Sequence, residues 1–248
     1  ITHRMSVNTV TPYQNSAQGK KQQVTQMFNT ISDTYDGLNR LISWGSDVRW
    51  RKFVVQKVAE IHPTTVLDVA TGTADLAIAL TNIPNVRITG LDISEGMLEV
   101  GREKIAKKKL TDRINLVHGD SEQLPFADAT FDAVTVGFGV RNFEDLKKGL
   151  SEILRVLKPK GRLVVLETSV PEKFPFKQGY HLYTNYMMPL IGKLFSKDRS
   201  AYRYLSDSAT HFPYGKKFQE ILDKVGYQRT EYYPKTLGGV ATIYIANK

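Results

Sequence analysis

Apolar residues in this chain occur in two kinds of pattern that follow one another along the sequence. Short runs rich in Val, Ile and Leu predict buried strands at 65–69, 86–92, 114–120, 131–136 and 162–168. Apolar residues spaced three and four apart predict helices at 76–80, 94–109, 143–157 and 216–225. Two further strands are predicted at 228–233 and 240–246. Strands alternating with helices indicate an α/β fold with a doubly wound, mostly parallel seven-stranded sheet.

Three segments depart from this alternation. Residues 1–19 are polar and are expected to form a flexible tail. Helical spacing within 20–62 predicts two helices that fold over the sheet as an N-terminal helical cap. The main domain, 63–248, contains an aromatic and methionine-rich helical insertion after the fifth strand, at about 172–212. Such side chains suit an irregular apolar ligand, as a lid would, while core packing or a homodimer contact explains the composition equally well.

Composition and charge restrict the class of protein. A chain of 248 residues, 41% of them hydrophobic, can bury one large core. The absence of cysteine excludes a disulfide framework and a thiolate nucleophile. No apolar run approaches the roughly 20 residues that span a bilayer, and no signal-peptide pattern is found, so a cytoplasmic location is expected. The net charge of +9 favours an anionic partner, either nucleic acid or a membrane surface.

The stretch from Thr65 to Leu76 is where we expect a ligand. The predicted strand ends at Asp68-Val69, and a turn of small residues around Gly72 leads directly into a helix, which presents backbone N–H groups to the ligand. The turn lacks the G-x-G-x-x-G spacing that a dinucleotide pyrophosphate requires. Asp68 and Asp75 instead place negative charge beside it, which favours a cation. S-adenosylmethionine carries a sulfonium and an ammonium and no phosphate, so it is the predicted cofactor.

Residues at the ends of neighbouring strands are expected to complete the cofactor site. Asp92, followed by Ile93, ends the second strand, where a carboxylate can accept hydrogen bonds from both ribose hydroxyls. Asp120 and Ser121 follow the third strand, where a carboxylate can accept from the adenine amine. Gly137 follows the fourth strand. The carboxyl ends of parallel strands meet at one crevice, so these residues should converge.

Four motifs taken together resemble the quinone-ring C-methyltransferases of menaquinone and ubiquinone biosynthesis. They are Phe28-Asn29-x-Ile31-x-x-x-Tyr35-Asp36-x-x-Asn39, Leu67-Asp68-x-Ala70-x-Gly72-Thr73-x-Asp75, Leu124-Pro125-Phe126 with Thr130-Phe131-Asp132, and Phe138-Gly139-Val140-Arg141-Asn142. The resemblance covers residues 20–246 and implies a class I, Rossmann-like methyltransferase fold. It also implies that S-adenosylmethionine is held by Thr73, Asp92, Asp120 and Ser121. Alanine stands at positions 70 and 74, where motif I of the class I methyltransferases (D-x-G-x-G-x-G/A) has its first and third glycines. Glycine stands at position 137, where the family often has serine.

Ring methylation needs an electron-rich carbon, which a hydroquinone provides once one hydroxyl has lost its proton. Arg141, with Asn142 beside it, is the first candidate to stabilise the resulting anion or to polarise a water, because a guanidinium stays protonated. Tyr35 and Asp36 are the second candidates, which would orient the quinol. A salt bridge for Arg141 and simple packing for Tyr35 are the structural alternatives.

The five histidines show no metal-binding spacing, so no metal site is expected. His181 and His211 fall in the predicted substrate region and are weaker candidates for a proton relay.

The resemblance implies 2-demethylmenaquinol as the prenylated quinol substrate. The corresponding benzoquinol, or another phenolic or lipid acceptor, stays an alternative. A prenylated quinol resides in the bilayer, so transient peripheral contact with the anionic inner membrane surface is expected. A nucleic-acid methyltransferase is a rival, but the chain lacks a nucleophilic cysteine and an [Asp/Asn]-Pro-Pro-[Tyr/Phe] motif, and no nucleic-acid partner is expected. A binding module without turnover is a second rival, which the intact Arg141-Asn142 pair argues against.

Overall fold

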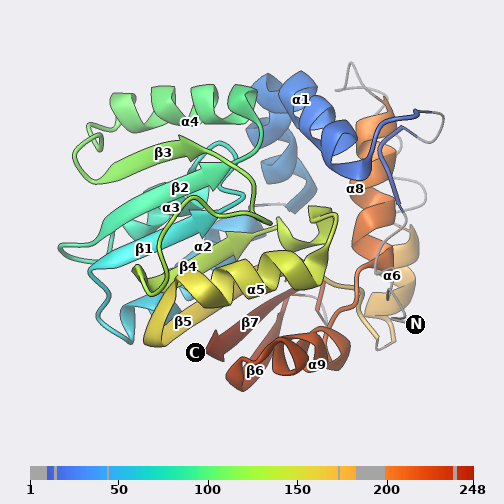
Figure 1. Cartoon of the computed structure of the whole chain (residues 1–248). Helices are drawn as coiled ribbons and strands as arrows, with labels where there is room; N and C mark the ends of the chain where they lie inside the picture. The colour runs from blue at the N-terminus through green and yellow to red at the C-terminus, as the bar shows by residue number, and fades with distance from the viewer. Residues whose placement is uncertain (1–9, 14–15, 44, 173, 183–198, 237–238) are drawn as a thin grey trace.

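The centre of the protein is a single seven-stranded sheet with the strand order β3-β2-β1-β4-β5-β7-β6 (Figure 1). The computed structural model describes residues 10–13, 16–43, 45–172, 174–182, 199–236 and 239–248. The strands are β1 (Thr65–Val69), β2 (Arg87–Asp92), β3 (Ile114–His118), β4 (Phe131–Gly137), β5 (Leu157–Thr168), β6 (Gln228–Lys235) and β7 (Ala241–Asn247). Strands β1 to β5 pair in parallel, and β7 lies antiparallel between β5 and β6. The predicted doubly wound, mostly parallel sheet is confirmed.

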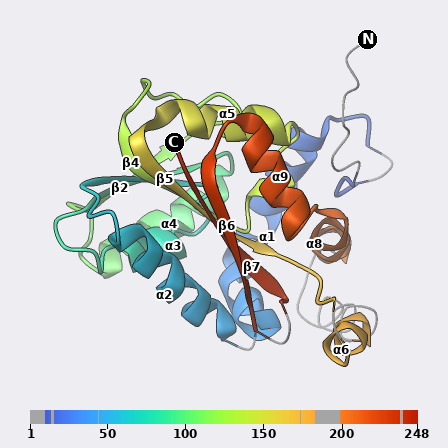
Figure 2. The same ribbon diagram turned by 90° about the horizontal axis from the view of Figure 1, so that it is seen from below.

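Helices cover both faces of this sheet (Figure 2). They are α1 (Lys20–Ser43), α2 (Ser46–Ala59), α3 (Asp75–Leu80), α4 (Glu95–Lys107), α5 (Leu146–Val156), α6 (Phe176–Leu182), α8 (Arg199–His211), α9 (Lys216–Val225) and the 3₁₀ turn η1 (Val140–Asn142). Helices α2, α3 and α4 contribute to one apolar core, and α5 and α9 to the other. Successive side chains of a strand point to opposite faces, so Val66 and Leu67 of β1 enter different cores.

Local hydrogen bonds explain where the helices near the strand ends begin. The hydroxyl of Ser94 accepts from the backbone N–H of Met97 and caps α4, as predicted. Asp145 caps α5 by accepting from the backbone N–H of Lys148, so this helix begins at Leu146 and not at the predicted 143. The segment in front of it forms η1, and Phe143 then adopts an extended conformation. Strand β5 also begins five residues earlier than the predicted 162.

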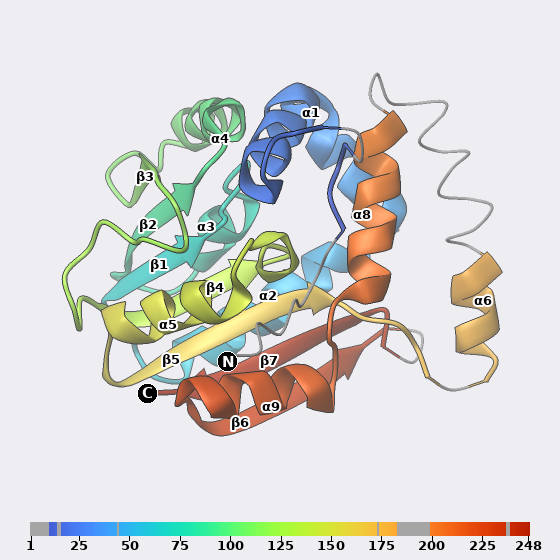
Figure 3. The same ribbon diagram turned by 45° about the vertical axis from the view of Figure 1, so that its right-hand side comes forward.

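Helix α1 lies between α4 and α8 (Figure 3). The three helices share a small apolar core formed by Val24, Met27, Ile31, Met97, Ala201 and Tyr204. This packing holds the N-terminal helix close to the carboxyl ends of β1 and β2. The predicted tail and the predicted insertion lie partly outside the described residues, which omit 1–9, 14–15, 173 and 183–198. Across the described segments, no helix combines the length and the apolar character that crossing a bilayer requires.

Candidate active site

The turn after β1 is braced by the carboxylate that ends β2. The backbone N–H of Gly72 donates to Asp92 Oδ2 over 2.8 Å, and the backbone N–H of Ser94 donates to Asp92 Oδ1 over 2.9 Å. Burial raises the pKa of Asp92, and these backbone donors oppose the rise by stabilising the charged form. Asp92 therefore shapes the predicted cofactor turn and borders it at the same time.

The backbone conformation of this turn explains why glycine is favoured at positions 70 and 74. Ala70, Gly72 and Ala74 have φ values of 53°, 56° and 64°. This left-handed conformation costs a residue with a Cβ about 1–2 kcal/mol. A Cβ added at Gly139 would lie 2.6 Å from the Cβ of Ala70, so the two motifs approach each other too closely for a side chain at 139. The turn after β1 and the turn after β4 are thus in contact.

A first cavity lies between α1 and the ends of β1, β2 and β4. Its lining includes Gly72, Asp92, Ile93, Asp120, Ser121 and Gly137, which are six of the predicted cofactor residues. Asn142 and Tyr35 border the same cavity, so two predicted catalytic residues lie beside the predicted cofactor residues. The convergence expected from the ends of parallel strands is present in this geometry.

Lys21 of α1 reaches this cavity, and the sequence analysis missed it. Its ammonium pairs with Asp120 Oδ2 at 2.8 Å and with Glu122 Oε2 at 3.3 Å. Burial lowers the pKa of Lys21, but the two carboxylates outweigh burial and raise it. A ligand amine that bound Asp120 would therefore share this carboxylate with a lysine of α1.

A second cavity lies on the other side of the Gly72 turn. The two cavities share Tyr35, Ala70, Gly72, Gly137 and Phe138, and the second cavity is further lined by Asp36, Asn39, Arg51, Asp68, Thr71, Thr73, Asp75, Leu76 and Leu166. Asp68 accepts hydrogen bonds of 2.6 Å from the hydroxyls of Thr71 and Thr135. Burial raises the pKa of Asp68 to about 6, despite these donors.

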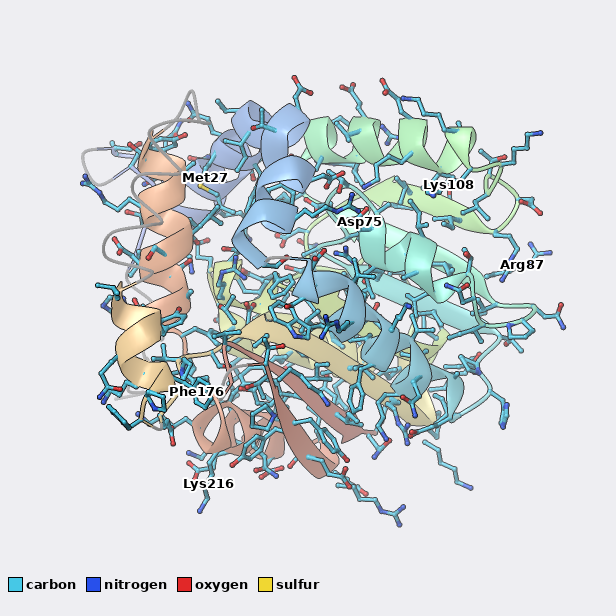
Figure 4. The ribbon with its side chains drawn as sticks, turned by 180° about the vertical axis from the view of Figure 1, so that it is seen from behind. Met27, Asp75, Arg87, Lys108, Phe176 and Lys216 are labelled. Carbon is cyan, nitrogen blue, oxygen red and sulfur yellow. The ribbon has the colours of Figure 1, made fainter. Side chains whose placement is uncertain are left out.

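Asp36, predicted to orient the substrate ring, links three elements of the structure. Thr73 Oγ1 donates to Asp36 Oδ1 over 2.5 Å, and Lys104 Nζ donates to Asp36 Oδ2 over 2.7 Å. Lys104 also pairs with Asp75. Figure 4 shows Asp75 where α1, α3 and α4 come together. In this arrangement Asp36 and Thr73 bind each other, and the catalytic role of Asp36 stays a prediction.

Arg141 forms a buried ion pair with a residue that the sequence analysis missed. Its Nη1 donates to Glu167 Oε1 over 2.6 Å and to the backbone carbonyl of Phe138 over 2.7 Å. The side chains of Arg141 and Glu167 are 5% and 0% exposed. Burial lowers the pKa of Arg141, but Glu167, together with Tyr35 and Tyr204, raises it overall, so the guanidinium stays charged. Glu167 could have been noticed as an acid within an apolar strand, because a buried charge needs a partner.

The η1 turn is also held from α1 and from α8. Lys20 Nζ donates to the backbone carbonyls of Arg141 and Phe143 over 3.1 and 2.9 Å. The Tyr204 hydroxyl donates to Asn142 Oδ1 over 3.0 Å. Helices from two distant parts of the sequence therefore fix this turn. Neither Lys20 nor Tyr204 carried a signal of this role in the sequence.

Tyr35 lies where the two cavities meet. Its ring packs edge-on against Phe28, with the centroids 5.8 Å apart. Burial raises the pKa of Tyr35, with the nearby charge of Arg141 opposing the rise. At neutral pH the side chain is a phenol and can donate a hydrogen bond into the cavity.

Of the two predicted proton-relay histidines, only His211 has a described side chain. His211 is exposed, and its Nδ1 lies 2.8 Å from the backbone carbonyl of Asp207. The side chain of His181 lies outside the described residues. Within the described ranges, no three His, Asp or Glu side chains are grouped so that they could hold a metal ion.

Comparison with known proteins identifies the family. The profile of the ubiE/COQ5 methyltransferase family matches residues 16–248. This chain belongs to the ubiE/COQ5 methyltransferase family. As a member of the ubiE/COQ5 family, it is a methyltransferase that uses S-adenosylmethionine, which confirms the predicted cofactor.

Curated relatives in the family match nearly the whole chain. A demethylmenaquinone methyltransferase of Bacteroides fragilis is 44% identical over 96% of this chain and 97% of the relative. A second protein of that name, from Porphyromonas gingivalis, is 43% identical over 98% and 99%. The ubiquinone/menaquinone biosynthesis C-methyltransferase UbiE of Geotalea daltonii is 45% identical over 92% and 97%.

Solved structures of low sequence identity share the fold of this ubiE/COQ5 family member. A SAM-dependent methyltransferase of Thermotoga maritima has a TM-score of 0.62 at 18% identity, covering 90% of this chain and 99% of that one. The [4+2]-cyclase SpnF has a TM-score of 0.64 at 17% identity, covering 94% and 97%. The fold therefore supports more than one chemistry, and function has to be argued from the site.

Proposed function

We propose that this methyltransferase transfers the methyl group of S-adenosylmethionine to a ring carbon of 2-demethylmenaquinol. The observation that carries the proposal is that Asn142 and Tyr35 border the same cavity as Gly72 and Asp92. A ring held by the first two residues would lie next to a methyl donor held by the last two. The names of the Bacteroides and Porphyromonas relatives support the naphthoquinol as the acceptor.

In this proposal the predicted cofactor residues hold different parts of S-adenosylmethionine. Asp92 and Ile93 hold the ribose, Asp120 and Ser121 hold the adenine, and Gly72 and Thr73 contact the chain that carries the sulfonium. Asp68 and Asp75 supply negative charge on the second-cavity side, and Gly137 leaves room at the end of β4. A Cβ at position 137 would lie 3.3 Å from Leu76, so a serine there would need a small shift of that side chain.

The proposed transfer starts when one quinol hydroxyl gives its proton to water. The negative charge that remains is shared by the oxygen and the adjacent ring carbon, and this carbon attacks the methyl group in line with its bond to sulfur. A C–C bond to the methyl group would form as the methyl group's bond to sulfur breaks, and the electron pair of that bond would stay on sulfur, which gives a neutral thioether. The ring carbon would then give its proton to water and the ring oxygen would take one back, so that the ring becomes aromatic again.

The residues of the site would stabilise the anion formed in this reaction. Arg141 keeps a positive charge behind the η1 turn, and Tyr35 keeps a phenolic proton that it can donate to the quinol oxygen. Asn142 borders the cavity in front of Arg141 and would position the ring. Fixed charges and donors of this kind stabilise a developing oxyanion without reorganising during the reaction.

The test uses the purified protein, methyl-labelled S-adenosylmethionine and two reduced, prenylated acceptors, one a demethylnaphthoquinol and one the benzoquinol. We expect a product of the naphthoquinol that carries the label on a ring carbon, detected by mass spectrometry. Preferential methylation of the benzoquinol would indicate the alternative that the name of the Geotalea relative includes. Cofactor binding without methylation of either quinol would overturn the proposal.

We also propose roles for two segments outside the sheet. Residues 20–62 serve as the cap over the main domain, and the helical insertion contacts a membrane surface. Phe174, Phe176 and Leu182 are exposed by 80%, 40% and 63%, and Lys177 lies among them. Figure 4 shows Phe176 at the opposite side of the molecule from Arg87 and Lys108. Apolar side chains next to a basic residue suit an anionic bilayer surface.

Co-sedimentation with phosphatidylglycerol vesicles tests the membrane contact. The Phe174→Ser/Phe176→Ser variant should bind these vesicles less than the wild type, while a Lys108→Ser variant on the opposite side should bind like it. Equal binding of all three proteins would contradict the contact. Loss of self-association in the double variant, measured by light scattering, would instead make this segment a homodimer contact.

A further inference from the structure

The second cavity has a charge pattern that fits the zwitterionic end of an amino acid. Three carboxylates line it, from Asp36, Asp68 and Asp75. Arg51 of α2 is the one arginine or lysine among the described lining residues of this cavity. Carboxylates on one side and a guanidinium on the other match an ammonium and a carboxylate carried by the same carbon.

The cofactor of the proposed function carries such an end. Its nucleoside has no charge, and its only anionic group is the carboxylate of the methionyl part. If the nucleoside occupies the first cavity beside Asp92 and Asp120, the methionyl chain continues past the Gly72 turn. Gly72 and Tyr35 border both cavities, so this path leads into the second cavity.

Arg51 has donors that point to a further partner. Its Nη2 pairs with Asp47, one turn earlier in α2, and lies 3.4 Å from Asp75 Oδ2. Both contacts use Nη2, and within the described part of the chain neither Nε nor Nη1 has a hydrogen bond. The side chain is 17% exposed and borders the cavity. Nε and Nη1 form the edge of a guanidinium with which a carboxylate can pair through two hydrogen bonds.

Neighbouring contacts keep Arg51 in this position. Asp47 is buried and also accepts a 2.8 Å hydrogen bond from the Ser43 hydroxyl, so the carboxylate that holds Arg51 is itself fixed. Asp75 pairs more closely with Lys104 than with Arg51. An incoming carboxylate would therefore not have to displace a tight partner of the guanidinium.

From this geometry we infer that Arg51 binds the carboxylate of the methionyl end of S-adenosylmethionine, with the ammonium placed among Asp36, Asp68 and Asp75. The inference rests on the proposed function, because it takes the nucleoside to lie in the first cavity. It adds α2 to the elements that hold the cofactor. It also gives Arg51 a direct binding role, beside its structural contact with Asp47.

The test compares two nucleosides that differ only in this end. S-adenosylhomocysteine keeps the amino acid, and 5′-methylthioadenosine lacks it. Calorimetry would measure both affinities for the wild type, Arg51→Gln and Arg51→Lys. The matched control is Arg49→Gln, because Arg49 is exposed on the same helix. Binding of 5′-methylthioadenosine shows in each case that the variant is folded.

We expect Arg51→Gln to weaken S-adenosylhomocysteine binding about 10- to 100-fold, as for the loss of charged hydrogen bonds, and to leave 5′-methylthioadenosine binding within about twofold. Arg51→Lys should lose less, and Arg49→Gln should match the wild type. Equal losses for both nucleosides, or no loss for either, would overturn the role of Arg51 while leaving the proposed function intact. A wild type that bound neither nucleoside would overturn both.

Discussion

Two turns border the first cavity, and side chains of opposite charge hold them. At the Gly72 turn after β1, the carboxylate of Asp92 accepts a hydrogen bond from the backbone N–H of Gly72. At the η1 turn after β4, Lys20 and Arg141 donate hydrogen bonds to backbone carbonyls. Side-chain anions thus support the first turn, and side-chain cations support the second.

The difference matches the charges of the two reactants in the proposed reaction. A sulfonium is cationic and is favoured beside carboxylates, whereas a quinol that loses a proton becomes anionic and is favoured beside cations. In both turns the charged groups also hold the backbone in place, so the field is fixed before a ligand arrives. The comparison teaches that one set of contacts can serve both the stability of a turn and its chemistry.

The largest expected effect comes from removing the cation of the η1 turn. Arg141→Ala leaves the carboxylate of Glu167 buried without its partner, so the free energy of unfolding should fall by about 3–5 kcal/mol. Turnover should fall as well, while affinity for S-adenosylhomocysteine should be largely retained. Urea denaturation and calorimetry measure the two effects.

The double variant Arg141→Ala/Glu167→Ala is the control for this pair. Because it removes both buried charges, it should be destabilised by clearly less than the sum of the two single variants. Strict additivity would mean that Arg141 and Glu167 do not act as a unit. It would contradict the statement that a side-chain cation supports the η1 turn.

The second effect concerns the anion of the Gly72 turn. Asp92→Ala removes the acceptor of the Gly72 and Ser94 N–H groups and the proposed ribose ligand, so cofactor affinity should fall about 10- to 100-fold. At saturating cofactor, turnover should change much less. Calorimetry and steady-state kinetics separate the two quantities. The control is Glu95→Ala, which changes an exposed acid in α4 and should leave both quantities unchanged. If Asp92→Ala mainly lowered turnover and Arg141→Ala mainly lowered cofactor affinity, the assigned roles would be refuted.

A third, smaller effect depends on pH and sharpens the comparison at Lys20. Burial lowers the pKa of Lys20 from 10.5 to about 8, although Glu122 and Glu144 oppose this shift. Between these two values the unfolded chain binds more protons than the folded chain, so the free energy of unfolding rises with pH there. Below about pH 8 the cost of burying the charged lysine is fully present. The advantage of the wild type over Lys20→Met should therefore grow from pH 7 to 9.5 in urea denaturation.

Lys21 provides a matched control for this pH dependence. Its carboxylate partners raise its pKa, so its stabilising contribution is fully present up to the ordinary pKa of lysine. The difference between the wild type and Lys21→Met should thus stay constant from pH 7 to 9.5. A growing difference for Lys21 and a constant one for Lys20 would reverse the two assignments.

The smallest effect is expected from Ala70→Gly in the first turn. Glycine removes the cost of a Cβ at a φ of 53°, and this gain is partly offset by the greater freedom of glycine in the unfolded chain. The free energy of unfolding should rise by up to about 1 kcal/mol, which would raise Tm by about 2–4 °C. Scanning calorimetry measures the shift. A lower Tm would show that packing of the Ala70 methyl group outweighs the strain.

The sequence predicted the parts of the structure that follow from periodicity and from strand ends. Strand β1 and helix α4 form within a few residues of their predicted positions, because an apolar strand and a Ser94 cap are local signals. The convergence of Asp92 and Asp120 followed from the parallel sheet. These features need no knowledge of how distant segments pack.

The contacts of the η1 turn could not be predicted in the same way. Glu167, Lys20 and Tyr204 meet there from a strand and two helices that are far apart in the sequence. No spacing along the chain marks such a meeting, since it depends on tertiary packing. The predicted start of α5 was wrong for a related reason, because the Asp145 cap and the η1 turn replace the first helical residues.

Helix α1 is one continuous element of 24 residues, with Lys21 near its start and Tyr35 and Asp36 further along. Lys21 borders the first cavity, Asp36 borders the second, and Tyr35 borders both. Long helices curve gently, and a sharp kink needs a specific cause such as a proline, which α1 lacks, so α1 moves largely as one piece. The two cavities therefore share a single wall, and any movement of that wall that opens one cavity alters the enclosure of the other.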